Sequence, residues 1–111
     1  MDSDRLSAVF GALAHPTRRA ILDRLARGDA NVGELYEPFG VSQPAISRHL
    51  KVLEQAGLIT RTRRATARLN HLEAGPLREA TIWLARYQEY WDESFERLDE
   101  LLASLQQERD G

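Results

Sequence analysis

The segment 42–55 places polar side chains of the kinds that read DNA bases on one side of a predicted helix. At about 100° per residue these side chains fall within one arc of roughly 140°. They are Gln43, Ser47, Arg48 and Lys51. Glutamine can pair with adenine, arginine with guanine, and serine with a base or a phosphate. These types and this spacing predict contact with the major groove of DNA; the alternative is a helix face that is only solvated.

The opposite arc of the same helix is apolar, which predicts that the helix is anchored on a core. The apolar side chains are Ile46, Leu50 and Leu53. Ser42 is the predicted N-cap and Gly57 the predicted stop. His49 falls beside the apolar arc, where a structural histidine is expected rather than a ligand or a pH switch.

Three helices are predicted before this segment: residues 3–14, a second helix from Pro16 to about Gly28, and a short third helix at about residues 32–37. Pro38 is expected to end the third helix, because proline lacks the main-chain donor. A short helix, a tight glycine turn and a capped helix predict a helix-turn-helix at about residues 32–56.

Arg18 and Arg19 fall in the first turn of the second helix, where the helix dipole disfavours cations. A compensating group is therefore expected. Either an internal carboxylate or a DNA phosphate would serve.

Residues 58–72 show the side-chain alternation and the Thr and Ile content that are typical of β-strands. This pattern predicts a two-stranded hairpin with its turn near residues 63–66. A last helix is predicted from about residue 76 to about residue 105, with Pro76 near its start. The expected fold is mainly α with a small β-hairpin, in one domain that covers residues 1–111.

Charge is unevenly distributed along the 111 residues, although the formal net charge is only -2. Residues 42–72 carry six basic side chains against Glu54 alone, a net charge of +5, whereas residues 73–111 carry four basic and ten acidic ones, a net charge of -6. One basic block in an acidic chain favours a face that binds a polyanion, and a solvated Arg-rich hairpin is the alternative.

Several functional classes find no support in the sequence. Cysteine is absent, which removes disulfides and thiolate metal ligands. We expect no cofactor, no catalytic residues and no enzymatic activity, because no nucleophile–base arrangement or phosphate-binding glycine loop occurs. No apolar run reaches the roughly 20 residues of a membrane span, and the polar start does not fit a signal peptide, so we expect no membrane association and a cytoplasmic location.

The last predicted helix carries an apolar stripe with seven-residue spacing, which favours helix–helix packing. About 30 residues give roughly 45 Å of helix, longer than the core of a domain with a radius of gyration near 13 Å. A homodimer is therefore expected. Its predicted interface comprises Leu77, Leu84, Tyr87, Trp91, Phe95, Leu98 and Leu102. The aromatic cluster Trp83, Tyr87, Tyr90 and Trp91 could serve packing or form a pocket for an unknown small-molecule effector.

Three stretches of this sequence resemble the ArsR/SmtB family of winged helix-turn-helix transcriptional repressors. They are ALAHPTRRAILDRL (12–25), VGEL (32–35) and VSQPAISRHLKVLEQAGLI (41–59). The resemblance implies a dimer whose subunits have five helices and a two-stranded wing at about residues 58–72. The DNA contacts that it implies, together with the helix analysis, are Ser42, Gln43, Pro44, Ser47, Arg48, Lys51, Arg63, Arg64 and Arg68.

The sequence departs from the family pattern at the wing turn, at Pro38 and at the metal ligands. The wing turn has Arg64 and Ala65 where the family usually has an acidic residue and glycine. The cysteines and last-helix histidines of the metal sensors are missing, so we expect no metal; a site begun by His71 and Glu73 is a minor alternative.

The predicted function is a dimeric repressor, not controlled by metal, that binds double-stranded DNA at an imperfect palindromic operator. A repressor that responds to a small molecule and a winged-helix interaction module without DNA affinity are the alternatives.

Overall fold

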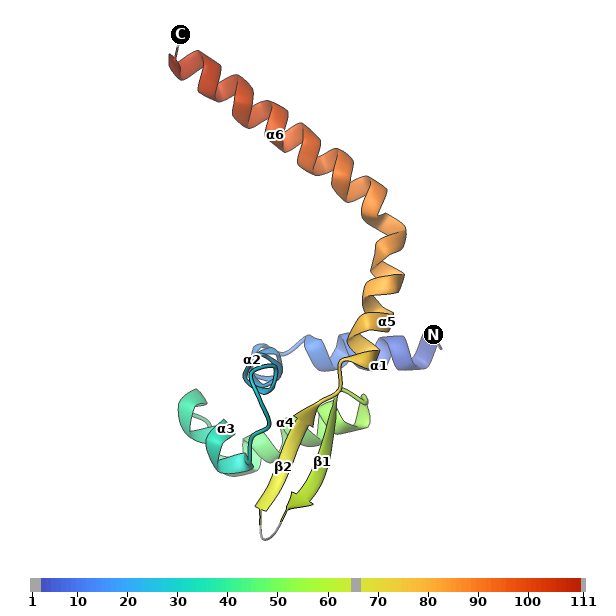
Figure 1. Ribbon diagram of the computed structural model, residues 1–111, viewed down its shortest axis with the longest axis vertical. Helices are drawn as coiled ribbons and strands as arrows, with labels where there is room; N and C mark the ends of the chain where they lie inside the picture. Colours follow the sequence, from blue (N-terminus) through green and yellow to red (C-terminus); the bar gives the residue numbers. More distant parts are fainter. Residues whose placement is uncertain (1–2, 65–66, 111) are drawn as a thin grey trace. The chain divides into compact units, whose positions relative to one another are not determined.

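The computed structural model describes residues 3–64 and 67–110 and divides the chain into two units, Met1–Ala80 and Thr81–Gly111. The first unit contains, in order, α1 (Ser3–Leu13), α2 (Pro16–Leu25), α3 (Val32–Phe39), α4 (Gln43–Gln55), β1 (Ile59–Arg64), β2 (Ala67–Leu72) and the start of α5 (Gly75–Leu84) (Figure 1). The predicted fold class, mainly helical with one β-hairpin, is confirmed.

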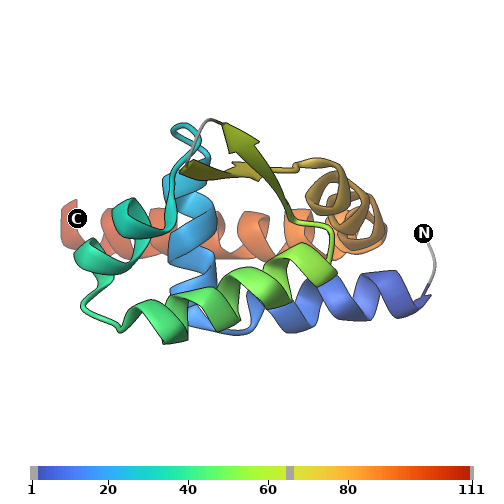
Figure 2. The same ribbon diagram turned by 90° about the horizontal axis from the view of Figure 1, so that it is seen from below.

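The core of the first unit is built around α4. Helices α1, α2 and α3 and strand β1 all contact α4, which lies among them in Figure 2. The larger fully buried side chains are Val9, Ile21, Leu35, Ile46, Leu50, Leu53, Leu58 and Ile59. The apolar arc predicted for the helix at 42–55 is therefore the part of α4 that enters the core.

Both ends of α4 are fixed by local hydrogen bonds, as the sequence predicts. The Ala45 N–H donates to Ser42 Oγ at 3.3 Å, which caps the first turn. At the other end the Gly57 N–H donates to the Glu54 carbonyl at 3.0 Å and the Leu58 N–H to the Leu53 carbonyl at 2.9 Å. Gly57 has a φ of 78°, so a residue without Cβ suits this turn. The turn places Leu58 in the core and starts β1.

The prediction that Pro38 ends the third helix is wrong, because α3 continues through it to Phe39. Asn31 and Glu34 form a capping box that fixes the start of the helix. Proline removes only one hydrogen bond in the last turn, and the helix stops at Gly40, which has a φ of 65°. Phe39 still packs partly against the core, as expected.

The two strands form an antiparallel hairpin whose register runs from Ile59 opposite Leu72 to Arg64 opposite Ala67. The predicted turn at residues 63–66 includes Ala65 and Thr66, which lie outside the described residues. The base of β2 is attached to the loop between α2 and α3: Asn70 and Ala30 exchange two main-chain hydrogen bonds of 2.9 and 3.2 Å. The buried Asn70 side chain also donates to the Ala30 carbonyl at 3.1 Å.

The second unit contains the end of α5, a 3-10 turn at Ala85–Tyr87 and α6 (Gln88–Asp110). The single last helix expected at about residues 76–105 is thus interrupted, and its helical part continues to Asp110. Residues 77–110 contain neither proline nor glycine, so the sequence carries no local signal for the interruption. Within the described ranges, no helix is both long and apolar enough to cross a membrane.

Truncation of the buried arc of α4 should destabilise the first unit. We expect Leu53→Ala to lower the free energy of unfolding by about 2–5 kcal/mol, because Leu53 is 0% exposed and its removal leaves a cavity. Val52→Ala is the control on the same helix, since Val52 is 37% exposed; it should cost less than about 1 kcal/mol. Urea unfolding at one fixed protein concentration measures both. Equal losses in the two variants would contradict this orientation of α4.

Candidate nucleic-acid interface

The polar arc of α4 is exposed along its whole length. Its residues are Ser42, Gln43, Pro44, Ser47, Arg48 and Lys51, all exposed. Because Ile46, Leu50 and Leu53 are fully buried on the other side, this arc cannot turn inward without opening the core. The arrangement leaves one amide, one guanidinium and one ammonium group free to approach a base edge or a phosphate.

His49 lies half-buried at the edge of that arc and packs against His15. Their ring centroids are 4.4 Å apart, and Arg18 Nη1 lies 3.4 Å from His49 Nδ1. Burial lowers the pKa of His49, and the nearby His15, Arg18 and Arg48 lower it further. The neutral ring can accept from Arg18, so the expected structural role of His49 agrees with its surroundings.

Arg18 and Arg19 donate to carbonyls at the end of α1, and within residues 3–64 and 67–110 no salt bridge joins either of them to a carboxylate. Arg18 Nε lies 2.7 Å from the Ala12 carbonyl and its Nη2 lies 3.0 Å from the Gly11 carbonyl. Arg19 Nη1 donates to the Leu13 carbonyl at 2.8 Å. The last carbonyls of a helix lack N–H partners within the helix and lie at the negative end of the helix dipole. The carbonyls at the end of α1 therefore stabilise the positive charges of Arg18 and Arg19.

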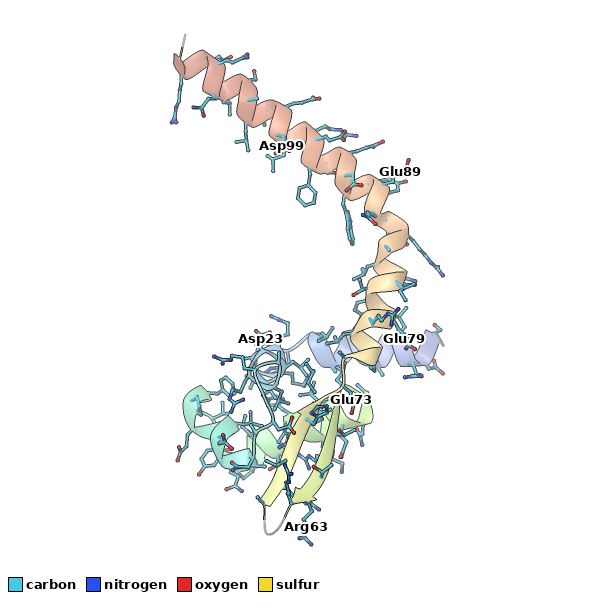
Figure 3. The ribbon with its side chains drawn as sticks, viewed as in Figure 1. Asp23, Arg63, Glu73, Glu79, Glu89 and Asp99 are labelled. Carbon is cyan, nitrogen blue, oxygen red and sulfur yellow. The ribbon has the colours of Figure 1, made fainter. Side chains whose placement is uncertain are left out.

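The predicted wing contacts Arg63, Arg64 and Arg68 are all exposed, and they divide between the two faces of the hairpin. Arg63 and Arg68 lie directly opposite each other, whereas Arg64 is paired with Ala67 on the other face. Figure 3 labels Arg63 close to the far end of the hairpin, with Glu73 at its base. The wing therefore carries basic side chains on both faces.

Sequence reasoning missed Arg61, which shares a hairpin face with Arg63 and Arg68. Its side chain is half-buried, and its Nε donates to Asn70 Oδ1 at 3.1 Å. Strand alternation could have identified Arg61 from the sequence, because residues two positions apart in a strand lie on the same face and Arg61 precedes Arg63 by two.

The two residues considered for a minor metal site have separate partners. His71 Nδ1 lies 2.7 Å from Asp29 Oδ1, and Glu73 Oε1 accepts from Thr60 Oγ1 at 3.1 Å. The hydrogen bond to Asp29 and its charge raise the pKa of His71. In the part of the chain that the structure describes, no three His, Cys, Asp or Glu side chains gather as a metal site would require.

The residues predicted for the dimer interface differ in exposure. Leu77 packs partly against the core of the first unit, and Leu84 is half-buried. The exposed ones are Tyr87, Trp91, Phe95, Leu98 and Leu102. In the aromatic cluster, the rings of Trp83 and Tyr87 lie 5.5 Å apart with a tilt of 57°. The helix α6 therefore presents a row of large apolar side chains, as its seven-residue spacing predicts.

The capped α4 helix with its exposed polar arc, the preceding α3 and the basic hairpin define a winged helix-turn-helix protein. Residues 15–61 match the model of the family described as bacterial regulatory protein, arsR family. The chain is 37% identical over 82 residues to the transcriptional repressor SdpR of Bacillus subtilis (strain 168). This match covers 74% of this chain and 91% of SdpR.

Solved structures agree with this assignment. The crystal structure of the ArsR family transcriptional regulator RHA00566 matches with a TM-score of 0.75 and 39% identity, over 83% of this chain and 95% of that one. The solution structure of the homodimeric winged helix-turn-helix DNA-binding domain of Mb0332 from Mycobacterium bovis matches with a TM-score of 0.62 and 30% identity, over 85% and 84% of the two chains. The chain belongs to the arsR family and is a DNA-binding transcriptional regulator.

The neutral state of His49 predicts a loss of stability at acidic pH. Because its pKa is lower in the folded than in the unfolded chain, the unfolded chain binds more protons, and stability falls as the pH drops below about 6.5. His49→Gln keeps an acceptor for Arg18 and does not titrate. Relative to the wild-type protein, the variant should therefore gain stability as the pH falls from about 7.5 to about 5.5, because the contribution of His71 is the same in both proteins. Urea unfolding of the two proteins measures this difference, and a variant that becomes relatively less stable at the lower pH would contradict the assignment.

The pair of His71 and Asp29 should have the opposite pH dependence. The pKa of His71 is raised, so the pair stabilises the fold fully below about 6.5, and this stabilisation is lost as the pH rises through the raised value. Asp29→Asn should therefore lower stability at about pH 5.5 and have little effect at about pH 8.5. The same unfolding series measures it, and a loss confined to the higher pH would show the sign to be wrong.

Proposed function

We propose that this regulator is a homodimeric repressor that binds an imperfect palindrome and blocks a promoter. The observation that carries the proposal is the exposed arc of α4 from Gln43 to Lys51, opposite a fully buried face. Two similar proteins support the proposal: SdpR is described as a transcriptional repressor, and the Mb0332 domain is described as homodimeric. Two copies of α4 related by a dimer axis would enter successive major grooves, so the half-sites should lie about 10–10.5 base pairs apart.

The proposed base contacts are Gln43 and Arg48, which have two-pronged hydrogen-bonding ends on the exposed arc. Ser42, Pro44, Ser47 and Lys51 complete the proposed contact surface in the major groove. Arg63, Arg64 and Arg68 are proposed to contact phosphates or the minor groove from the wing. A basic segment of net charge +5 within an acidic chain supports this division.

We propose that residues 1–111 act as one DNA-binding domain whose terminal helices dimerise. The exposed row from Tyr87 to Leu102 needs a second surface, and a copy of itself satisfies this need most simply. We propose no metal control and no catalysis, because the sequence has no cysteine, no histidine in the last helix and no recognisable nucleophile–base arrangement. The aromatic effector pocket, the interaction module and the cytoplasmic location stay predictions.

Replacing Arg48 should change sequence preference as well as affinity. We expect Arg48→Ala to cost about 1–3 kcal/mol on the specific duplex and to relax the preference at one position per half-site, because a bidentate base contact is lost. A binding-site selection with the purified protein supplies the operator, and titration against specific and scrambled duplexes measures the effect.

Arg64→Ala is the matched wing variant. It should weaken binding to both duplexes alike and reduce the slope of log affinity against log salt by about one unit. Should Arg48→Ala also weaken both duplexes equally, its contact is to phosphate. A wild-type protein without preference between the duplexes would rule out sequence-specific regulation.

Charges placed in the apolar row of the last helical segment should dissociate the dimer. We expect Leu84→Asp with Leu98→Asp to give monomers, because the two carboxylates would be buried without partners at the interface. Ala103→Asp with Gln107→Asp adds the same charge on the opposite side of the helix and should leave the dimer intact. Light scattering measures the mass of each. An unchanged mass in the leucine variant would exclude this interface.

A further inference from the structure

An open groove of about 320 Å³ lies between the end of α4 and the hairpin. Its lining residues are Glu54, Arg61, Thr62, Arg63 and Arg68. Three arginines and one glutamate therefore line the groove. The groove carries excess positive charge beside the helix that is proposed to enter the major groove.

The register of the hairpin creates this concentration of charge. Arg63 and Arg68 are directly opposite each other in the two strands, and like charges in this position destabilise a hairpin. Arg61 adds a third cation on the same face. Across residues 3–64 and 67–110, the structure gives none of these three arginines an ion-pair partner. A bound anion would relieve the repulsion among them.

Arg61 is held in place before any ligand arrives. Its Nε donates to Asn70 Oδ1 at 3.1 Å, and the same Asn70 amide donates through Nδ2 to the Ala30 carbonyl at 3.1 Å. Asn70 is only 1% exposed. A guanidinium group has five N–H donors, so the bond from Nε leaves its terminal nitrogens available for an anion. The planar guanidinium fork matches the oxygens of a phosphate or a carboxylate, and DNA supplies phosphates.

We propose that this groove binds one phosphodiester group of the DNA backbone, with Arg61 as a direct contact and Asn70 as its positioning residue. The inference rests on the proposed function, in which α4 occupies a major groove and the wing contacts phosphates or the adjacent minor groove. The backbone strand that separates those two grooves must pass between the two elements, and the groove lies there. Glu54 is the one acidic side chain that lines the groove, and its negative charge repels the phosphate.

Single methylphosphonate substitutions along the selected operator test this assignment, because each removes one phosphate charge. At one position per half-site, replacing the phosphate with a methylphosphonate should lower the affinity of the wild-type protein for the operator about tenfold. A loss of this size is expected for charge-assisted hydrogen bonds. In Arg61→Gln the same substitution should change affinity by less than about twofold. Arg64→Gln, on the other face of the wing, should bind more weakly overall and keep the tenfold effect at that phosphate.

Two further variants test the roles of the neighbouring residues. Glu54→Gln should bind the unmodified operator severalfold more tightly, and this gain should vanish on the methylphosphonate operator. Asn70→Ser should reduce the effect of that one methylphosphonate and leave the effects of the others unchanged.

The outcomes separate the two proposals. Full sensitivity of Arg61→Gln at every phosphate would overturn the groove assignment while the DNA-binding function stands. Failure of the wild-type protein to bind any selected duplex would overturn the proposed function and the groove assignment together.

Discussion

The burial of Ile46, Leu50 and Leu53 fixes α4 in rotation about its own axis, and the other features of the interface depend on that constraint. A helix with one fully buried arc has only one arc left for a partner, so the burial of these aliphatic side chains orients Gln43 and Arg48 outward. Helices α1, α2 and α3 and strand β1 all contact α4. The first 80 residues thus act as a support that presents one face of one helix.

Several basic residues elsewhere in the first unit bind groups within it. Arg18 and Arg19 donate to the last carbonyls of α1, and Arg24 pairs with Glu34 at 3.3 Å. His49 stays neutral beside them, so no further cation is added beneath the arc. Among the described residues, Arg63, Arg64 and Arg68 of the wing have no salt bridge, so an external polyanion can engage them.

The wing depends on a second, smaller anchor at Asn70. This residue joins β2 to the loop after α2 through both its main chain and its side chain, and it receives the Arg61 guanidinium on its other side. A hairpin of two strands has little stability by itself, so attachment at its base limits how its basic face can move. One buried amide thereby connects the core to a side chain in the groove between wing and helix.

Features that depend on neighbours along the chain could be predicted from the residues alone. The Ser42 cap, the Gly57 stop, the two strands and the two-faced pattern of α4 all follow from short-range hydrogen bonds and periodicity, and each is present as predicted. The groups that Arg18 and Arg61 bind could not be predicted in this way, because their partners come from other elements. Sequence patterns also did not predict that α3 continues through Pro38 or that a 3-10 turn forms at residues 85–87. Side-chain partners depend on how elements pack, and a one-dimensional pattern does not contain that packing.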